Sequence, residues 1–221
     1  MNSRILVTPA RFKGQPGFDI KVRDSKITVQ GLLDELNQAY QEMNLPRLWP
    51  GNRVDCAGCD LCCQEPLPVT SVDVRQLRET LGVGETEVFR YLWVELQGPA
   101  ADITLRRVRG GKCVFLNTQG RCRVYAARPF ACQTYLCCKT GPIFEAMRGQ
   151  IVNAGMDELV RSSIAGFQRI GQPFPVNRSY QGQLNQRDWP KGYFTGKTSY
   201  SEVRLARILS FDLWRKMLLL E

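Results

Sequence analysis

Hydrophobic and charged residues alternate near the start of the chain. Phe18, Ile20 and Val22 are separated by charged residues, and this period of two predicts a strand within an extended stretch over residues 1–26. Pro16-Gly17, directly before the alternation, predicts a turn. Nothing in this stretch has the pattern of a catalytic or ligand-binding site.

Apolar residues at steps of three and four predict helices in much of the remaining chain. The clearest is Val29–Met43, whose apolar face runs through Leu32, Leu36 and Tyr40 and ends before Pro46. Further helices are expected over 71–81, with Thr70 or Ser71 as cap and Gly82 as stop, and over 85–96, 142–148, 157–170 and 199–220.

A turn-rich segment lies between these helices. Gly110-Gly111 and Asn117–Gly120 predict turns, and a helical turn is expected within Tyr125–Cys138. Short strands are expected over Ile103–Val108, Cys113–Leu116 and Arg121–Val124. We therefore predict an α+β fold, a helix-rich chain around a small cysteine-rich, metal-stapled centre of β-hairpins and loops.

The composition is that of an ordinary globular protein, with 43% hydrophobic and 23% charged residues in a chain of 221. We expect one core shared by an N-terminal strand and helix (1–48), a cysteine region (49–140) and a helical region (141–221). No apolar run approaches the ~20 residues of a membrane span. The start of the chain also lacks the apolar core of a secretory signal. These features favour a cytoplasmic, reducing location.

All nine cysteines lie between Cys56 and Cys138, and the first four form the pattern C-x2-C-x2-C-C. Thiolates at this spacing can chelate one ion from a tight turn, for which Gly58 supplies backbone freedom. Two other interpretations remain open. One is a disulfide framework, which a reducing compartment disfavours. The other is a cysteine-lined helix face, because steps of three and four are also helical.

The chain contains no histidine, which restricts its chemistry. Ser-His-Asp and Cys-His catalysis are excluded, as are imidazole ligands. Any metal is therefore held by cysteine, with carboxylate, backbone or water as the remaining candidates. Side chains of consecutive residues in extended backbone point in opposite directions, so Cys62 and Cys63 are not expected to bind one ion alike. Three arrangements would accommodate these two orientations: two four-thiolate sites, one iron–sulfur cluster with the other thiols free, or one metal centre with a further thiol beside it.

Basic residues are concentrated among the later cysteines. Residues 100–150 hold nine lysines and arginines against only Asp102 and Glu145, in a chain with a net charge of +9. The charge could bind nucleic acid or an acidic protein. Compensation of thiolate charge is the favoured interpretation because the basic residues are interleaved with the cysteines.

The ordered motifs of this region resemble a known family. They are C-x2-C-x2-C-C, then Cys113-Val-Phe-Leu, Gly120-Arg-Cys-Arg-Val-Tyr and Arg128-Pro-Phe-Ala-Cys. Together they resemble the CxxCxxCC or YkgJ-type cysteine-cluster family, a zinc- or iron-chelating domain. The resemblance implies as metal ligands Cys56, Cys59, Cys62, Cys63, Cys113, Cys122, Cys132 and either Cys137 or Cys138, of which we select Cys137.

The sequence supports three functional hypotheses. The first is a metal-binding module with a structural or adaptor role, holding zinc or iron. The second is an iron–sulfur enzyme or electron-transfer protein, because relatives of the cluster include flagellin lysine methylases. The third is a nucleic-acid binder that uses the Arg-rich segment 106–128. Tyr125 and Arg128 are expected to donate hydrogen bonds to thiolates or nearby carbonyls.

Overall fold

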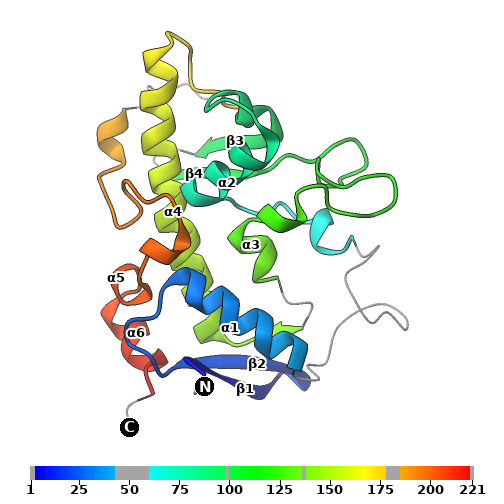
Figure 1. Cartoon of the computed structure of the whole chain (residues 1–221), viewed down its shortest axis with the longest axis vertical. Coiled ribbons are helices and arrows are strands. Elements are labelled where there is room, and N and C mark those ends of the chain that lie inside the picture. The colour runs from blue at the N-terminus through cyan, green and yellow to red at the C-terminus, as the bar shows by residue number, and fades with distance from the viewer. Residues whose placement is uncertain (1–2, 43–59, 98–99, 136–137, 178–184, 220–221) are drawn as a thin grey trace. The chain divides into compact units, whose positions relative to one another are not determined.

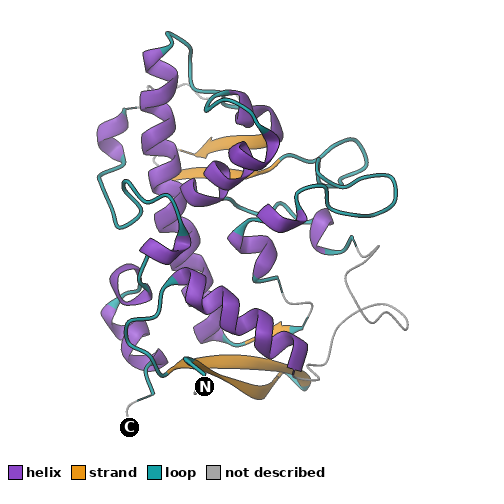
Figure 2. Cartoon of the chain, viewed as in Figure 1, coloured by secondary structure: helices purple, strands orange, loops and turns teal. Residues whose placement is uncertain are grey.

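The structure is a computed structural model of the chain, and it describes residues 3–42, 60–97, 100–135, 138–177 and 185–219 (Figure 1). Helices and small sheets occur together, which confirms the α+β class (Figure 2). The chain forms two compact units, each assembled from separated segments. Unit 1 comprises residues 1–52, 133–151 and 196–221, and unit 2 comprises 53–132 and 152–195.

Unit 1 contains a three-stranded sheet. Strands β1 (Ile5–Phe12) and β2 (Gln15–Val22) pair antiparallel in full register, and β5 (Lys139–Thr140) joins β2 in parallel. The turn lies at Lys13-Gly14, both with positive φ, as a two-residue hairpin requires. The expected turn at Pro16-Gly17 is therefore wrong, since both residues are paired within β2.

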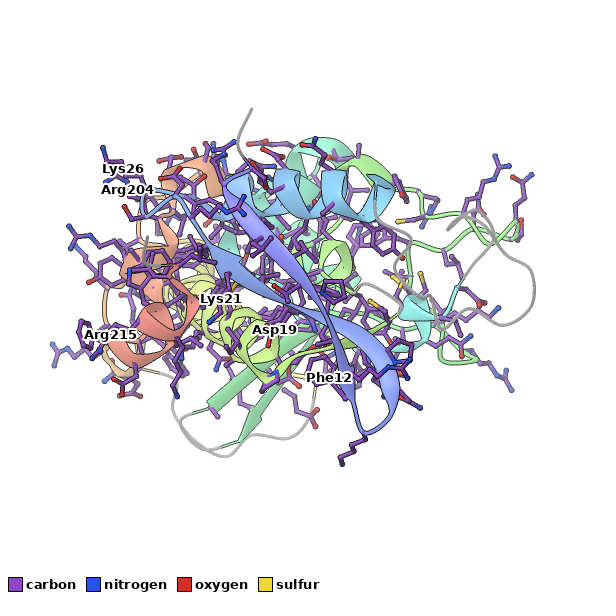
Figure 3. All side chains as sticks on the ribbon, turned by 90° about the horizontal axis from the view of Figure 1, so that it is seen from below. Phe12, Asp19, Lys21, Lys26, Arg204 and Arg215 are labelled. Carbon is purple, nitrogen blue, oxygen red and sulfur yellow. The ribbon has the colours of Figure 1, made fainter. Side chains whose placement is uncertain are left out.

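The apolar faces of β2 and α1 (Val29–Glu42) form the core of unit 1. Both elements have the periods predicted for them, and Leu32, Leu33 and Leu36 are buried. Asp19 fixes the start of the long helix α4 (Pro142–Arg169), because its Oδ1 accepts the Phe144 N–H at 3.0 Å. Figure 3 labels Asp19 on β2.

The C-terminal part of unit 1 is not the single helix that the apolar pattern predicts. It consists of η5 (Tyr200–Glu202), α5 (Leu205–Ile208) and α6 (Phe211–Met217). Val203 is extended, and its carbonyl oxygen accepts the Val29 N–H at 2.8 Å. This contact with a distant segment competes with helical hydrogen bonding, and Ser210 then caps a new helix.

Unit 2 begins its regular structure with α2 (Ser71–Leu81), which Thr70 caps and Gly82 ends, as predicted. The expected helix over residues 85–96 is wrong. Only η2 (Glu87–Tyr91) is helical, and β3 (Leu92–Gln97) follows, paired antiparallel with β4 (Ala100–Leu105). Leu92, Val94 and Leu96 also fit the period of two of a strand. All three side chains are buried in the core of unit 2, and this burial favours the strand over a helix.

The long helix α4 contributes its residues up to Ile151 to unit 1 and those from Val152 onward to unit 2. Helix α4 replaces the two shorter helices expected over 142–148 and 157–170, because Ile151, Val152 and Met156 continue the buried face between them. Phe167 near its end packs edge-on against Phe89 at a centroid distance of 5.2 Å. A short turn, η4 (Gln186–Asp188), follows. No helix in the described ranges is long and apolar enough to cross a membrane.

Candidate metal centre

Five of the predicted ligands lie in the described part of unit 2: Cys62, Cys63, Cys113, Cys122 and Cys132. Cys56, Cys59 and Cys137 lie outside the described residues. Cys138 directly precedes β5 and belongs to unit 1. The described cysteines are all free thiols, so a disulfide framework finds no support among them.

Cys62 and Cys63 lie on a single 3-10 turn, η1 (Cys62–Gln64). The extended backbone assumed for this pair is therefore wrong, and the two side chains are in contact. The Cys63 thiol donates a hydrogen bond to the Cys62 sulfur, which lowers the pKa of Cys62 and raises that of Cys63. Of the five described thiols in unit 2, only Cys62 has a pKa shifted toward the thiolate.

The turn before Cys113 is attached directly to η1. The Cys113 N–H donates to the Cys63 carbonyl oxygen at 2.8 Å, and Arg107 Nη1 donates to the Gln64 carbonyl oxygen at 2.9 Å. Lys112 also pairs with Asp60 at 2.7 Å, and its hydrogen bond lowers the pKa of that carboxyl group. Three contacts therefore hold two distant cysteine segments together.

A second turn places Cys122. The Asn117 N–H donates to the Arg121 carbonyl oxygen at 2.9 Å, and Leu116 pairs with Cys122 as an isolated bridge. Between the two turns, Phe115 is buried and stacks on Tyr91 with ring centroids 5.3 Å apart. The predicted turns are thus confirmed. The strands expected at 113–116 and 121–124 are reduced to single bridges, because each turn leaves too few residues to pair.

Cys132 is carried by α3 (Phe130–Gln133), whose start is held by a buried carboxylate. Asp73 is fully buried and forms a reciprocal capping box with Thr70. Its Oδ1 also accepts the Phe130 N–H at 2.8 Å. The Thr-x-x-Asp spacing is a local signal for the capping box formed by Thr70 and Asp73, but no local pattern signals the hydrogen bond from the Phe130 N–H.

The five thiols lie close enough to influence one another electrostatically. Burial raises the pKa values of Cys113, Cys122 and Cys132, and the charge of Cys62 raises them further. The positive charge of Arg128 lowers the pKa values of Cys62 and Cys122. The cluster therefore favours ionisation at one sulfur and needs further positive charge to ionise the others.

A divalent cation is a suitable source of that charge. The donors are exclusively sulfur, which suits zinc and iron better than magnesium or calcium. In the described part of the chain, no three Cys, Asp or Glu side chains are arranged as a metal-ligand group. The described cysteines therefore fit a metal by donor chemistry and mutual proximity.

Arg128 and Tyr125 form a stacked pair beside the thiols. The guanidinium carbon lies 3.9 Å from the centroid of the Tyr125 ring, and the ring is more than half exposed. Stacking fixes the guanidinium near Cys62 and Cys122, whose pKa values it lowers. This agrees with a charge-compensating role for Arg128. Donation by Tyr125 to a thiolate or carbonyl remains a prediction.

Residues 55–147 match the family CxxCxxCC, described as "Putative zinc- or iron-chelating domain". The match confirms the resemblance drawn from the sequence and supports metal binding by this segment. No curated protein and no solved structure matches the chain.

Proposed function

We propose that the chain binds zinc or iron through a thiolate centre in which Cys62, Cys63, Cys113, Cys122 and Cys132 take part. The observation that carries this proposal is the meeting of η1, two turns and α3 in unit 2, each bringing cysteine. Cys56 and Cys59 belong to the same expected ligand set through their C-x2-C spacing. Cys137 is the eighth expected ligand.

The bound metal has a structural role in this proposal. Each of the two turns is closed by one isolated bridge and a few backbone hydrogen bonds rather than by a continuous ladder. Ligation by sulfurs from η1, the two turns and α3 would replace the missing ladder and fix the turns relative to α3. An iron–sulfur cluster that serves an enzyme or electron transfer is the alternative use of the same sulfurs.

Anaerobic purification followed by elemental analysis and visible absorption tests the proposal. Zinc gives a colourless protein with stoichiometric metal, whereas an iron–sulfur cluster gives a brown protein that absorbs near roughly 400 nm. Cys113→Ser with Cys122→Ser should remove the metal, and Thr118→Ser in the same turn should retain it. Full metal content in the double cysteine variant would contradict the proposal.

A second function, nucleic-acid binding, is supported by the arginines at the two turns. Residues 103–144 contain no Asp or Glu. The Arg106 and Arg107 side chains donate hydrogen bonds to backbone carbonyl oxygens. The positive charges of Arg123 and Arg128 oppose the rise in the pKa values of nearby thiols. The exposed side chains of Arg109 and Arg121 make no hydrogen bond or ion pair within the described residues. Charge compensation therefore does not account for these two arginines.

Salt-dependent binding to a fluorescent single-stranded RNA tests this second function. Each phosphate contact contributes about 0.7 to the slope of log affinity against log salt concentration. Replacing Arg109 and Arg121 with alanine should reduce that slope by about 1.4. Arg75→Ala with Arg204→Ala is the matched control. An unchanged slope in the turn variant would remove the proposal.

A further inference from the structure

Basic side chains from two distant segments meet on unit 1. Residues 21–28 comprise the end of β2 and the loop after it, and the Val22 carbonyl oxygen accepts the Leu219 N–H at 2.8 Å. Lys21 Nζ also donates to the Lys216 carbonyl oxygen at 2.5 Å. The unit 1 basic surface consists of the lysines and arginines of residues 21–28 and 204–219: Lys21, Arg23, Lys26, Arg204, Arg207, Arg215 and Lys216. Figure 3 labels Lys21, Lys26, Arg204 and Arg215.

Most of this charge has no ion-pair partner in the described part of the protein. Five of the side chains are exposed and make no hydrogen bond or ion pair within the described residues: Arg23, Lys26, Arg204, Arg207 and Lys216. The acidic residues of the two segments are only Asp24 and Asp212. Like charges repel, so folding brings these basic residues together at a cost in free energy. A partner with negative charge would offset that cost.

An exposed aromatic ring accompanies the basic surface. Phe211 begins α6 and is 72% exposed, although Leu213 and Met217 of the same helix are buried. The Arg215 guanidinium carbon lies 5.6 Å from the centroid of the Phe211 ring, so a positive charge lies beside the apolar group. Leu219, after the end of α6, is also exposed. Unpaired positive charge and exposed apolar side chains therefore occur together on this segment.

We propose that the unit 1 basic surface binds the anionic face of a phospholipid bilayer, with Phe211 inserted at the boundary of the acyl chains. Lipid phosphates and carboxylates complement the lysines and arginines, and each basic residue near the bilayer adds to the attraction. Phenyl and leucine side chains both gain by leaving water at that depth. A single-stranded nucleic acid fits less well, because a base can stack on Phe211 but not on Leu219.

The proposed binding is peripheral. Helix α6 has 7 residues, and its side chains Leu213 and Met217 are already buried in the protein. Only side chains on the exposed side of this helix would therefore reach the lipid. One ring and a set of basic residues give reversible binding that weakens as salt screens the charges.

Sedimentation of the full-length protein with vesicles tests the proposal. The protein should bind vesicles of equimolar phosphatidylcholine and phosphatidylserine at low salt, and should not bind vesicles of phosphatidylcholine alone. Each basic residue contributes about fivefold to the affinity, so Arg207→Ala with Lys216→Ala should weaken binding about 25-fold. Arg187→Ala with Lys191→Ala removes the same charge from exposed positions of unit 2 and should leave binding unchanged.

Substitutions of Phe211 test insertion separately from charge. Phe211→Ser should weaken vesicle binding about tenfold, whereas Phe211→Leu should retain most of it, because leucine also enters the acyl boundary. Tyr193→Ser, at an exposed aromatic residue of unit 2, is the matched control. Circular dichroism of each variant should match that of the wild-type protein, because the substituted side chains are exposed.

Three results would overturn the proposal. They are no binding to the anionic vesicles at low salt, equal binding to both kinds of vesicle, and affinity that neither the Arg207 and Lys216 double variant nor Phe211→Ser changes. Displacement of the vesicles by a fluorescent single-stranded RNA whose affinity falls in Phe211→Leu would also overturn it, since that would define a base-stacking surface. Metal analysis of the same samples keeps this test separate from that of the thiolate centre in unit 2.

Discussion

The Cys113 N–H donates to the Cys63 carbonyl oxygen at 2.8 Å, so two distant cysteines share a backbone hydrogen bond. This bond fixes their positions through main-chain atoms and leaves both sulfurs available for other interactions. Lys112 and Asp60 reinforce it with an ion pair. In the proposed thiolate centre, this arrangement would provide part of the scaffold without a metal.

Arg128 should control how tightly that centre binds metal. Arg128→Ala removes a positive charge that lowers the pKa values of Cys62 and Cys122, so thiolate formation becomes less favourable. We expect zinc affinity to fall about 10-fold to 100-fold, measured by competition with a chromophoric chelator. Arg128→Lys should retain more affinity than Arg128→Ala, and Arg75→Ala is the surface control. Unchanged affinity in Arg128→Ala would exclude the role.

Asp73 should determine whether α3 holds Cys132 in place. Asp73→Ala removes the carboxylate from the capping box and from the Phe130 N–H, leaving buried donors without their acceptor. We expect a loss of about 3 kcal/mol in the free energy of unfolding, measured in urea. Glu79→Ala on the exposed side of the same helix should cost less than about 0.5 kcal/mol. Similar losses in the two variants would show that Asp73 contributes no more than a surface residue.

Two glycines of α4 should respond oppositely to alanine. A Cβ at Gly155 would lie 2.5 Å from Thr70 Cβ, and Thr70 is fully buried in its capping box. We therefore expect Gly155→Ala to destabilise the protein by roughly 1–3 kcal/mol. A Cβ at Gly149 would meet no described atom within 4 Å, so Gly149→Ala should stabilise it by roughly 0.5–1 kcal/mol. Thermal unfolding of both variants measures the contrast, and equal shifts would contradict the close packing.

The Asp102 carboxyl group should make stability depend on pH. Its pKa is raised above the ordinary value of 3.8, so the folded state retains a proton that the unfolded state loses. Stability therefore falls as the pH rises from the ordinary to the raised pKa. Asp102→Asn should raise the melting temperature at pH 7 and have little effect below pH ~3. A melting temperature that responds equally at both pH values would argue against repulsion at this site.

Local patterns are sufficient to predict some of these features. The alternation of Phe18, Ile20 and Val22 in β2 and the helical period of α1 are unambiguous, and the turns before Cys113 and Cys122 have their expected places. The sequence could not predict that Leu92–Gln97 is a strand, because its apolar spacing fits both periods and pairing with β4 decides. Nor could it predict the division at Val203, which a hydrogen bond from distant Val29 causes.

In the candidate site, too, local sequence patterns predict some features, whereas others depend on contacts between residues far apart in the sequence. Spacing and family motifs identify the cysteines. The contact between Cys62 and Cys63 depends on a 3-10 turn, which spacing does not specify. The hydrogen bond from Phe130 to Asp73 joins residues far apart in the sequence, so only the folded chain reveals it.

X-ray absorption spectroscopy at the metal edge tests the thiolate centre most directly. The protein purified anaerobically should show a first coordination shell of sulfur, at about 2.3 Å for zinc, with about four sulfurs per metal. The Cys113→Ser and Cys122→Ser double variant should lose that shell together with its metal. A first shell of oxygen or nitrogen in the wild-type protein would contradict the account.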